Sequence, residues 1–284
     1  MKAPAPSTWY ALGAAMRADL RRVPFIVGDL VVGAVAANEL AALAAFDELQ
    51  VQDDGVVLAV APEERDAALA RVNAALRDAG RLRGWRDELF PLYDPATLTV
   101  LAHFERAAAR YWGTLTLGAH ATGWVAGPDG RPAALWVAQR SFTKSTDPGL
   151  HDNLIGGGVP IGQTPEETLV REAWEEAGLT PALMAARRPG RVLRTARDIP
   201  EGLQHELIHG WDLELPAGVV PCNQDGEVHA FRLLDVEAAL ALAATAAMTV
   251  DAALVTLDFA VRHGLVDDEA TLARLQPLVV GLSG

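Results

Sequence analysis

Cysteine is nearly absent from this sequence, which contains one such residue, Cys222, among 284. A single cysteine excludes an intramolecular disulfide and fits a protein of a reducing compartment. No Cys–His spacing around Cys222 indicates a catalytic thiol, so we interpret it as a passive small residue. We therefore expect neither disulfide stabilisation nor thiol chemistry.

Basic residues are scarce relative to acidic ones: 24 Lys and Arg stand against 37 Asp and Glu, giving a formal net charge of -13. Binding to a nucleic-acid backbone is built from clustered Lys and Arg, so this balance argues against a nucleic-acid partner. An anionic small molecule would have to be attracted locally, by a few basic side chains and a bound cation, against the field of the whole protein.

Long uninterrupted apolar runs are also missing. The most apolar early stretch, residues 24–46, is interrupted by Asp29, Asn38 and Glu39, which argues against a membrane span. The N-terminus lacks the basic, then apolar, then cleavable pattern of a secretory signal. These absences predict a cytoplasmic protein without a membrane partner.

What the chain does contain is enough apolar sequence for a large core, because 50% of its 284 residues are hydrophobic. This length allows one large or two ordinary domains. Mixed helical and strand-like periodicity predicts a small α/β domain over residues 1–95 and a second domain over residues 96–284. In the second domain we expect a helix over 104–113, strands over 114–120, 123–126, 134–139, 207–215 and 226–231, and helices over 235–246 and 249–263.

The strongest local signal is a helix that carries its own start and stop residues. Thr164, Pro165 and Glu167 form a capping box with proline at the first helical position. Gly178 follows where a left-handed residue would end the helix. Between these signals, an apolar stripe at helical spacing predicts the buried face: Leu169, Val170, Ala173 and Ala177.

Three glutamates on this helix, Glu172, Glu175 and Glu176, fall at i, i+3 and i+4, so their carboxylates gather on one side. A divalent cation would turn their mutual repulsion into attraction, and hard oxygen ligands suit Mg²⁺ or Mn²⁺. The alternative is a solvated acidic helix face.

A glycine-rich loop in front of the helix favours the functional interpretation. Glycine lets backbone approach a ligand closely, so we take Gly157 and Gly158 as candidate substrate-binding residues. A solvated helix face would not need such a loop, which contains Gly156, Gly157, Gly158 and Gly162.

Helix and loop together resemble the Nudix hydrolase signature, G-x5-E-x7-R-E-U-x-E-E-x-G-U, where U is a bulky aliphatic residue. The matching residues are Gly157, Arg171, Glu172, Glu175, Glu176, Gly178 and Leu179. The sequence departs from the pattern at Gln163, which replaces the first glutamate, and at Ala173, which is smaller than usual. The resemblance implies an α/β/α sandwich with a mixed sheet and a metal-dependent hydrolase of organic diphosphates.

The resemblance also implies roles for individual residues. The three later glutamates of the signature would hold the metal, and Glu172 or Glu175 would activate water. Arg171 would orient these glutamates through charge-assisted hydrogen bonds. Nudix enzymes commonly add a carboxylate from outside the signature, and we assign this role to Glu227, with a surface glutamate as the alternative.

Basic and histidine residues outside the signature supply further candidates. Arg140 and Lys144 could neutralise a substrate phosphate, or could belong to a solvated loop. The Trp85–Arg86 pair could line a ligand cleft, although a tryptophan that anchors a domain interface is the more ordinary interpretation. Three histidines could act as bases, but structural pairing is the more common role for each: His205, His209 and His229.

Segments outside the signature resemble one Nudix branch over about residues 20–264. These are the Trp-Arg-x-Glu-Leu pattern from Trp85, the Glu-Arg-Ala segment from Glu105, the Gly-x-His strand at 118–120 and the Arg-Ser-x-Thr-Lys segment from Arg140. The branch is similar to the Nudix part of fungal thiamine pyrophosphokinases and to plant chloroplast Nudix proteins. It implies hydrolysis of thiamine diphosphate, or of its damaged oxo and oxy analogues, to the monophosphate and phosphate.

Two other functions remain open at this point, namely a Nudix hydrolase of nucleoside diphosphate derivatives such as ADP-ribose, and a non-catalytic ligand-binding Nudix module. Gln163 replaces the first signature glutamate, a loss of the kind that a non-catalytic module would show. The intact Glu172, Glu175 and Glu176 argue against it. We include a homodimer among the expected assemblies.

Overall fold

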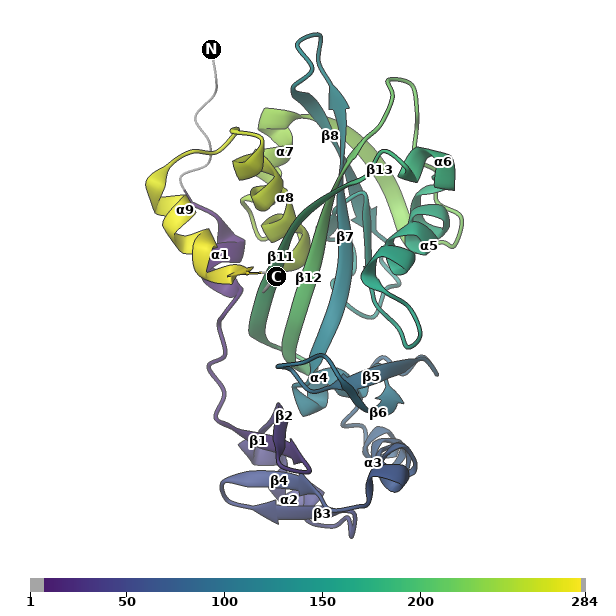
Figure 1. Ribbon diagram of the computed structural model, residues 1–284, viewed down its shortest axis with the longest axis vertical. Coiled ribbons are helices and arrows are strands. Elements are labelled where there is room, and N and C mark those ends of the chain that lie inside the picture. Colours follow the sequence, from purple (N-terminus) through teal and green to yellow (C-terminus); the bar gives the residue numbers. More distant parts are fainter. Residues whose placement is uncertain (1–7, 282–284) are drawn as a thin grey trace.

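The computed structural model describes residues 8–281 of the chain. A small sheet lies at one end of the molecule and a larger sheet flanked by helices at the other (Figure 1). Within residues 8–281, no helix is both long and apolar enough to cross a membrane.

The small sheet has the strand order β2-β1-β4-β3. Its strands are β1 (Arg22–Val27), β2 (Leu30–Ala36), β3 (Leu49–Gln52) and β4 (Gly55–Leu58), and α3 (Arg65–Asp78) packs with them. Strand β1 pairs in parallel with β4, while the other pairs are antiparallel. The apolar stretch over residues 24–46 therefore folds into two strands and the short helix α2 (Leu40–Leu43). This confirms the prediction of a small α/β unit.

The larger sheet is mixed and has the strand order β13-β8-β7-β12-β11-β14, with β10 also paired to β7 and β9 to β8. Its neighbouring central strands, β7 (Leu115–Ala126) and β12 (Gly202–Glu214), run parallel to each other over ten residue pairs. The other strands are antiparallel to their neighbours: β8 (Pro132–Arg140), β9 (His151–Asp152), β10 (Ile155–Gly158), β11 (Arg188–Ile199), β13 (Val228–Asp235) and β14 (Val279–Val280).

Helices cover both faces of this sheet (Figure 1). On one face, α5 (Pro165–Ala177) and α6 (Pro181–Met184) pack over Leu117, Ala119 and Leu207. On the other face, α7 (Val236–Ala243) and α8 (Val250–Arg262) pack over Trp124 and Ile208. The architecture is the predicted α/β/α sandwich with a mixed sheet, because side chains alternate between the faces of each strand and both faces are apolar.

A hairpin and a short helix join the two parts of the molecule. Strands β5 (Leu89–Tyr93) and β6 (Val100–Glu105) form the hairpin, and α4 (Ala108–Trp112) follows it. The predicted helix over 104–113 was wrong at its start, because Phe104 and Glu105 still pair in the hairpin. Trp112 stacks on Phe25 of the small sheet with ring centroids 4.4 Å apart, so α4 anchors the two parts together.

The first helix, α1 (Tyr10–Ala14), lies beside α9 (Glu269–Leu275) against the larger unit (Figure 1). Trp9 and Ala11 are buried in the core that contains α8. The start of the predicted 1–95 domain therefore contributes to the second core. The boundary at residue 95 stays a prediction, and the β5–β6 hairpin spans it.

Candidate active site

The helix with capping signals forms as predicted, from Pro165 to Ala177. The Thr164 hydroxyl accepts a hydrogen bond from the Glu167 amide at 3.2 Å, and the Glu167 carboxylate accepts one from the Thr164 amide at 2.8 Å. Gly178 ends the helix with a φ of 64°, in the left-handed region that favours glycine. The helix register, and with it the direction of its glutamates, is thus fixed locally.

Arg171 organises the carboxylates on this helix. Its Nη2 donates to Glu172 at 2.7 Å and its Nη1 donates to Glu175 at 2.5 Å. Its Nε donates to the side-chain oxygen of Gln163 at 3.2 Å, and the same oxygen accepts a bond from the Thr168 hydroxyl at 2.9 Å. Gln163 therefore keeps the acceptor oxygen that a signature glutamate would provide, without its charge.

Glu176 is the most buried of the three predicted metal ligands, at 5% exposure. Its carboxylate accepts hydrogen bonds from the Gly156 amide at 3.0 Å and from Lys144 Nζ at 3.3 Å. Burial raises the pKa of Glu176 to about 8, an effect that Lys144 opposes and the charge of Glu172 reinforces. Burial likewise raises the pKa of Glu172, against the neighbouring charge of Arg171.

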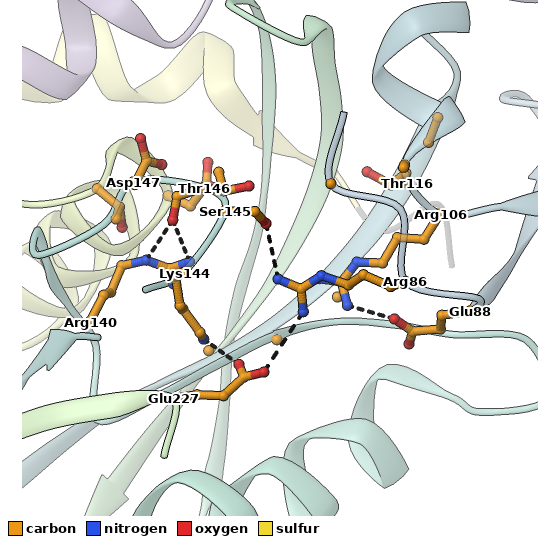
Figure 2. Close-up of a pocket in the computed structure, with 18 of the residues that line it drawn as sticks. Arg86, Glu88, Arg106, Thr116, Arg140, Lys144, Ser145, Thr146, Asp147 and Glu227 are labelled. Atoms are coloured by element: carbon orange, nitrogen blue, oxygen red, sulfur yellow. Dashed lines mark hydrogen bonds and ion pairs between the residues drawn. The ribbon is translucent and has the colours of Figure 1, made fainter. Parts of the chain in front are cut away.

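Lys144 connects the signature helix to Glu227, the predicted carboxylate from outside the signature. Its Nζ lies 2.5 Å from the Glu227 carboxylate, which also lies 3.7 Å from the guanidinium of Arg86 (Figure 2). Burial would raise the pKa of Glu227, but the hydrogen bond and charge of Lys144 hold it below its usual range. The structure therefore brings together Lys144, Glu176 and Glu227, which lie far apart in sequence.

Arg140 lies at the end of β8 with its guanidinium already bonded. It donates to Asp152 at 2.8 Å and to the carbonyl of Thr146 at 2.9 Å (Figure 2). These bonds hold the 141–149 loop, which carries Lys144, against the end of the sheet. Arg140 also lines the cavity described below. Its bonds to Asp152 and Thr146 are contacts that support the loop.

The region before β7 contributes basic side chains to the same place. Arg86 donates to the Ser145 hydroxyl at 3.2 Å, and Arg106 donates to Glu88 at 2.8 Å with its guanidinium 5.1 Å from the ring centre of Phe90 (Figure 2). Sequence reasoning proposed Arg86 as a cleft residue but missed Arg106, whose sole signal was the Glu-Arg-Ala segment. The Arg77 guanidinium lies 4.5 Å from the centre of the Trp85 ring, and Trp85 lines a neighbouring cavity that shares Arg86, Lys144 and Glu227.

Together with the basic residues above, Arg171, Glu172 and Glu175 line a cavity of about 460 Å³, a volume that suits a small organic ligand. Glu176 does not line this cavity, and instead lines a smaller pocket with Arg140, Lys144 and Glu227. The lining of the larger cavity joins the signature helix, the glycine strand, the 141–149 loop, the hairpin and the end of β12. The charged residues of this lining are Arg83, Arg86, Glu88, Arg106, Arg110, Arg140, Lys144, Asp147, Asp152, Arg171, Glu172, Glu175, Glu201, Glu206, Asp225, Glu227 and Asp251. Sequence reasoning missed Glu206 and Asp251, which belong to no motif.

The glycines proposed for close approach are packed against side chains of the site. A Cβ on Gly157 would lie 2.4 Å from the Glu172 carboxylate, and one on Gly158 would lie 3.0 Å from the Phe90 ring. Both glycines line the cavity. They allow β10 to pass between the signature helix and the hairpin, which a larger residue would prevent.

The three candidate histidines lie elsewhere. His205, His209 and His229 are not among the residues that line the cavity in the described chain. Burial lowers the pKa of His205 and His209, and His229 packs edge-on against Phe142 at 5.1 Å. Their burial and packing, away from the cavity, indicate structural roles for the three histidines.

The donor set fits a hard divalent cation in its chemistry, because Glu172, Glu175 and Glu176 offer carboxylate oxygens from one helix. Within residues 8–281, however, no three His, Cys, Asp or Glu side chains are already gathered as a metal cluster. The reason is that Arg171 spreads the first two carboxylates and Lys144 holds the third. A cation would replace contacts that these two basic side chains now make.

Comparison with known proteins assigns both parts of the chain. Residues 116–254 match the NUDIX domain family, and residues 13–116 match a domain of unknown function, DUF4743. Nudix hydrolase 20, chloroplastic, of Arabidopsis thaliana is 34% identical over 264 residues, covering 88% of this chain and 70% of that protein. Nudix hydrolase 24, chloroplastic, of the same plant is 36% identical over 256 residues, covering 87% and 69%.

Among solved structures, the DR0079 protein of Deinococcus radiodurans is similar at 23% identity and a TM-score of 0.45, covering 61% of this chain and 98% of that one. The two plant relatives match nearly the whole chain, and the signature residues lie on a helix that borders a charged cavity. The chain therefore belongs to the Nudix hydrolase family, the hydrolases that act on pyrophosphate bonds.

Proposed function

We propose that this enzyme hydrolyses the diphosphate of thiamine diphosphate, or of its oxo and oxy analogues, to the monophosphate and phosphate. The observation that carries the hydrolysis is the cavity in which the signature carboxylates Glu172 and Glu175 meet a set of arginine and lysine side chains. The choice of thiamine rests on the sequence resemblance to one Nudix branch. Hydrolysis of a nucleoside diphosphate derivative such as ADP-ribose, and ligand binding without catalysis, are the alternatives.

In this proposal Glu172, Glu175 and Glu176 hold Mg²⁺, with Mn²⁺ as the other candidate. When bound, the cation would neutralise phosphate charge and polarise phosphorus. Glu175 is the most exposed of the three carboxylates, with 39% of its side chain exposed against 13% for Glu172 and 6% for Glu176. Glu175 is therefore best placed to take a proton from water, with Glu172 as the second candidate base.

Arg171 positions these carboxylates through its two bonds to Glu172 and Glu175. Glu227 would act with Lys144, which also contacts Glu176 of the signature helix, and the lowered pKa of Glu227 keeps it ionised. The negative charge of Glu227 would suit an additional cation ligand, and its contact with Lys144 holds that lysine in the cavity. Lys144 and Arg140 would then face substrate phosphate, beside the backbone of Gly157 and Gly158.

The DUF4743 region contributes Arg86, Phe90 and Arg106 to this cavity. A diphosphate has at least two negative charges, and a chain with a net charge of -13 needs local cations to attract it. We therefore propose that this region completes the substrate site, and that its arginines contact the phosphates or the leaving group.

The first experiment is phosphate release with Mg²⁺ from thiamine diphosphate, its oxo and oxy analogues, ADP-ribose and nucleoside triphosphates. Glu175→Gln should lose at least a hundredfold in kcat, because the variant can neither hold metal nor accept a proton as before. Glu166→Gln is the matched control, since Glu166 lies on the same helix and pairs with Arg187 outside the cavity. It should behave like the wild type.

The outcomes separate the alternatives. A preference for thiamine compounds that disappears in Glu175→Gln supports the proposal. Turnover of ADP-ribose instead keeps the chemistry and refutes the substrate. Silence across the panel, with binding of one compound detected by calorimetry, would favour the binding module. Cytoplasmic location and a homodimer stay predictions, to be checked by fractionation and light scattering.

A further inference from the structure

His120 lines the cavity and has no part in the catalytic proposal. It is the histidine of the Gly-x-His segment and lies in β7, with 7% of its surface exposed. Each of the two nitrogens of an imidazole can donate or accept a hydrogen bond, depending on which of them carries the proton. The contacts of each nitrogen therefore decide what this histidine offers to a ligand.

The Nδ1 atom of His120 is bonded within the protein. It lies 3.1 Å from the side-chain oxygen of Asn153. The side-chain nitrogen of Asn153 donates to the Ala252 carbonyl at 3.3 Å and to the Thr256 hydroxyl at 3.0 Å, both on α8. A carbonyl only accepts, so the amide nitrogen must face α8 and the amide oxygen must face His120. Nδ1 therefore carries a proton and donates it to Asn153, and Nε2 of the neutral ring has a lone pair.

The Nε2 atom of His120 has no such partner. It forms no hydrogen bond with a residue in the described part of the chain, yet it is open to the cavity, whereas Nε2 of His209 is buried without a partner. The Asp152 carboxylate lies 3.8 Å from Nδ1 and accepts from Arg140 at 2.8 Å. Water can satisfy Nε2 in a solvated cavity, but a ligand that displaces this water has to replace its hydrogen bond.

His120 lies beside a signature carboxylate and a cavity arginine. It pairs with Gly156 across β7 and β10, and a Cβ on Gly156 would lie 2.8 Å from the ring carbon Cε1, so the ring packs on that glycine. The Gly156 amide donates to Glu176 at 3.0 Å. Gly158 is two residues further and shares the face of β10 that His120 covers, and a Cβ there would lie 3.3 Å from the Arg106 guanidinium. One short strand thus contacts the histidine, the carboxylate and the arginine.

We propose that His120 is a substrate-binding residue whose Nε2 accepts a hydrogen bond from an N–H or O–H group in the organic part of the diphosphate. Arg106 would contact the adjoining phosphate. This orientation follows because a lone pair on Nε2 repels phosphate oxygens, which mainly accept hydrogen bonds, whereas a guanidinium attracts them. Asn153 is then a positioning residue that decides which nitrogen of His120 faces the ligand.

This inference rests on the proposed diphosphate hydrolysis and adds a requirement on the substrate. The organic group must carry a hydrogen-bond donor near the diphosphate, which a simple alkyl diphosphate does not have. Such a donor pays no penalty for the water that it displaces, because it restores the hydrogen bond to Nε2.

The test uses two substitutions that each keep one nitrogen position of the imidazole. His120→Asn retains a donor in the place of Nδ1 and removes the acceptor at Nε2, whereas His120→Gln retains an acceptor in the place of Nε2. His229→Gln is the matched control, because His229 is an exposed histidine outside the cavity. The measured quantities are kcat and KM with Mg²⁺ for thiamine diphosphate and ADP-ribose, and the inhibition constant of inorganic pyrophosphate, which has no organic part.

His120→Asn should raise the KM of the hydrolysed compound about tenfold, with little change in kcat and an unchanged inhibition constant for pyrophosphate. His120→Gln should recover most of this loss, and the control should match the wild type. An unchanged KM, an equal rise in KM and in the pyrophosphate constant, or a fall in kcat alone would overturn the assignment.

Failure of the hydrolysis proposal would look different, because the wild type would then turn over neither compound. His120 would in that case be judged by the calorimetric Kd of thiamine diphosphate and ADP-ribose. A Kd about tenfold higher for His120→Asn than for the wild type would support the contact, and equal affinities would overturn it.

Discussion

Replacing Asp251 by asparagine should make the protein more stable at neutral pH, although it removes a charge from the cavity. Burial raises the pKa of Asp251 to about 6, and the charge of Glu206 adds to this effect. In the unfolded chain the group titrates near its ordinary value of about 3.9. The folded state therefore binds the proton more tightly, so stability falls as the pH rises through the window between these two values and stays lower above it.

The size of this effect follows from the shift. A difference of about two pKa units corresponds to about 3 kcal/mol between the protonated and charged forms, as an upper bound for a coupled pair. Asparagine resembles the protonated form, and its side-chain oxygen can still accept the hydrogen bond that Gln204 donates to Asp251 at 2.7 Å. We therefore expect Asp251→Asn to be more stable by about 1 to 3 kcal/mol at pH 8 and nearly unchanged at pH 4.

Urea unfolding at pH 4, 6 and 8 measures this difference directly. Asp29→Asn is the control, because Asp29 is an exposed residue in the turn between β1 and β2, and it should show no such pH-dependent gain. A variant that is less stable than the wild type at pH 8 would refute the argument that burial beside Glu206 makes the charged form of Asp251 unfavourable.

Three further predictions concern single contacts. Gln163→Glu places a negative charge beside Arg171, so it should raise the free energy of unfolding by about 0.5 to 1 kcal/mol, measured by thermal unfolding. The change in kcat/KM should be less than tenfold. A large loss of activity would show that Gln163 has a role of its own in catalysis. Arg106→Gln should raise the KM for the diphosphate about tenfold with little change in kcat, and a fall in kcat alone would contradict a binding role. A Cβ at position 118 would lie 2.4 Å from the Glu206 carboxylate, so Gly118→Ala should displace that side chain and reduce stability by about 1 to 2 kcal/mol; an unchanged unfolding midpoint would contradict this.

The sequence predicted those elements that carry their own boundary signals. The helix α5 formed from its capping box to its terminal glycine, and the predicted helix over 249–263 forms as α8. Strand β11 was missed because its arginines recur at 188, 191, 194 and 197, which hides a two-residue alternation. The ion-pair partners of such arginines can lie far along the chain, as Asp258 does for Arg191 at 2.5 Å. The local sequence pattern therefore could not show that a strand accommodates these arginines.

The same reasoning separates the predictable part of the site from the rest. Arg171 contacts Glu175 at i,i+4, a pair that helical spacing favours, whereas its contact with the adjacent Glu172 was expected from the family resemblance. Glu206 and Asp251 come from a strand and a helix that pack together, and no local rule pairs them. Lys144 in its loop was a candidate from the sequence, but its position between two carboxylates depends on the fold.

The docking of α1 on the larger unit has a consequence for how this chain folds. Trp9 is 2% exposed, and the Tyr10 amide donates to the Ala244 carbonyl at 2.9 Å, so α1 packs against a segment that leaves the ribosome much later. Contacts of such wide sequence separation form late, since closing the loop between them is costly in entropy. The first helix must wait, with its tryptophan exposed, until α7 and α8 have been synthesised. During synthesis the small sheet can therefore form before α1 docks on the larger unit.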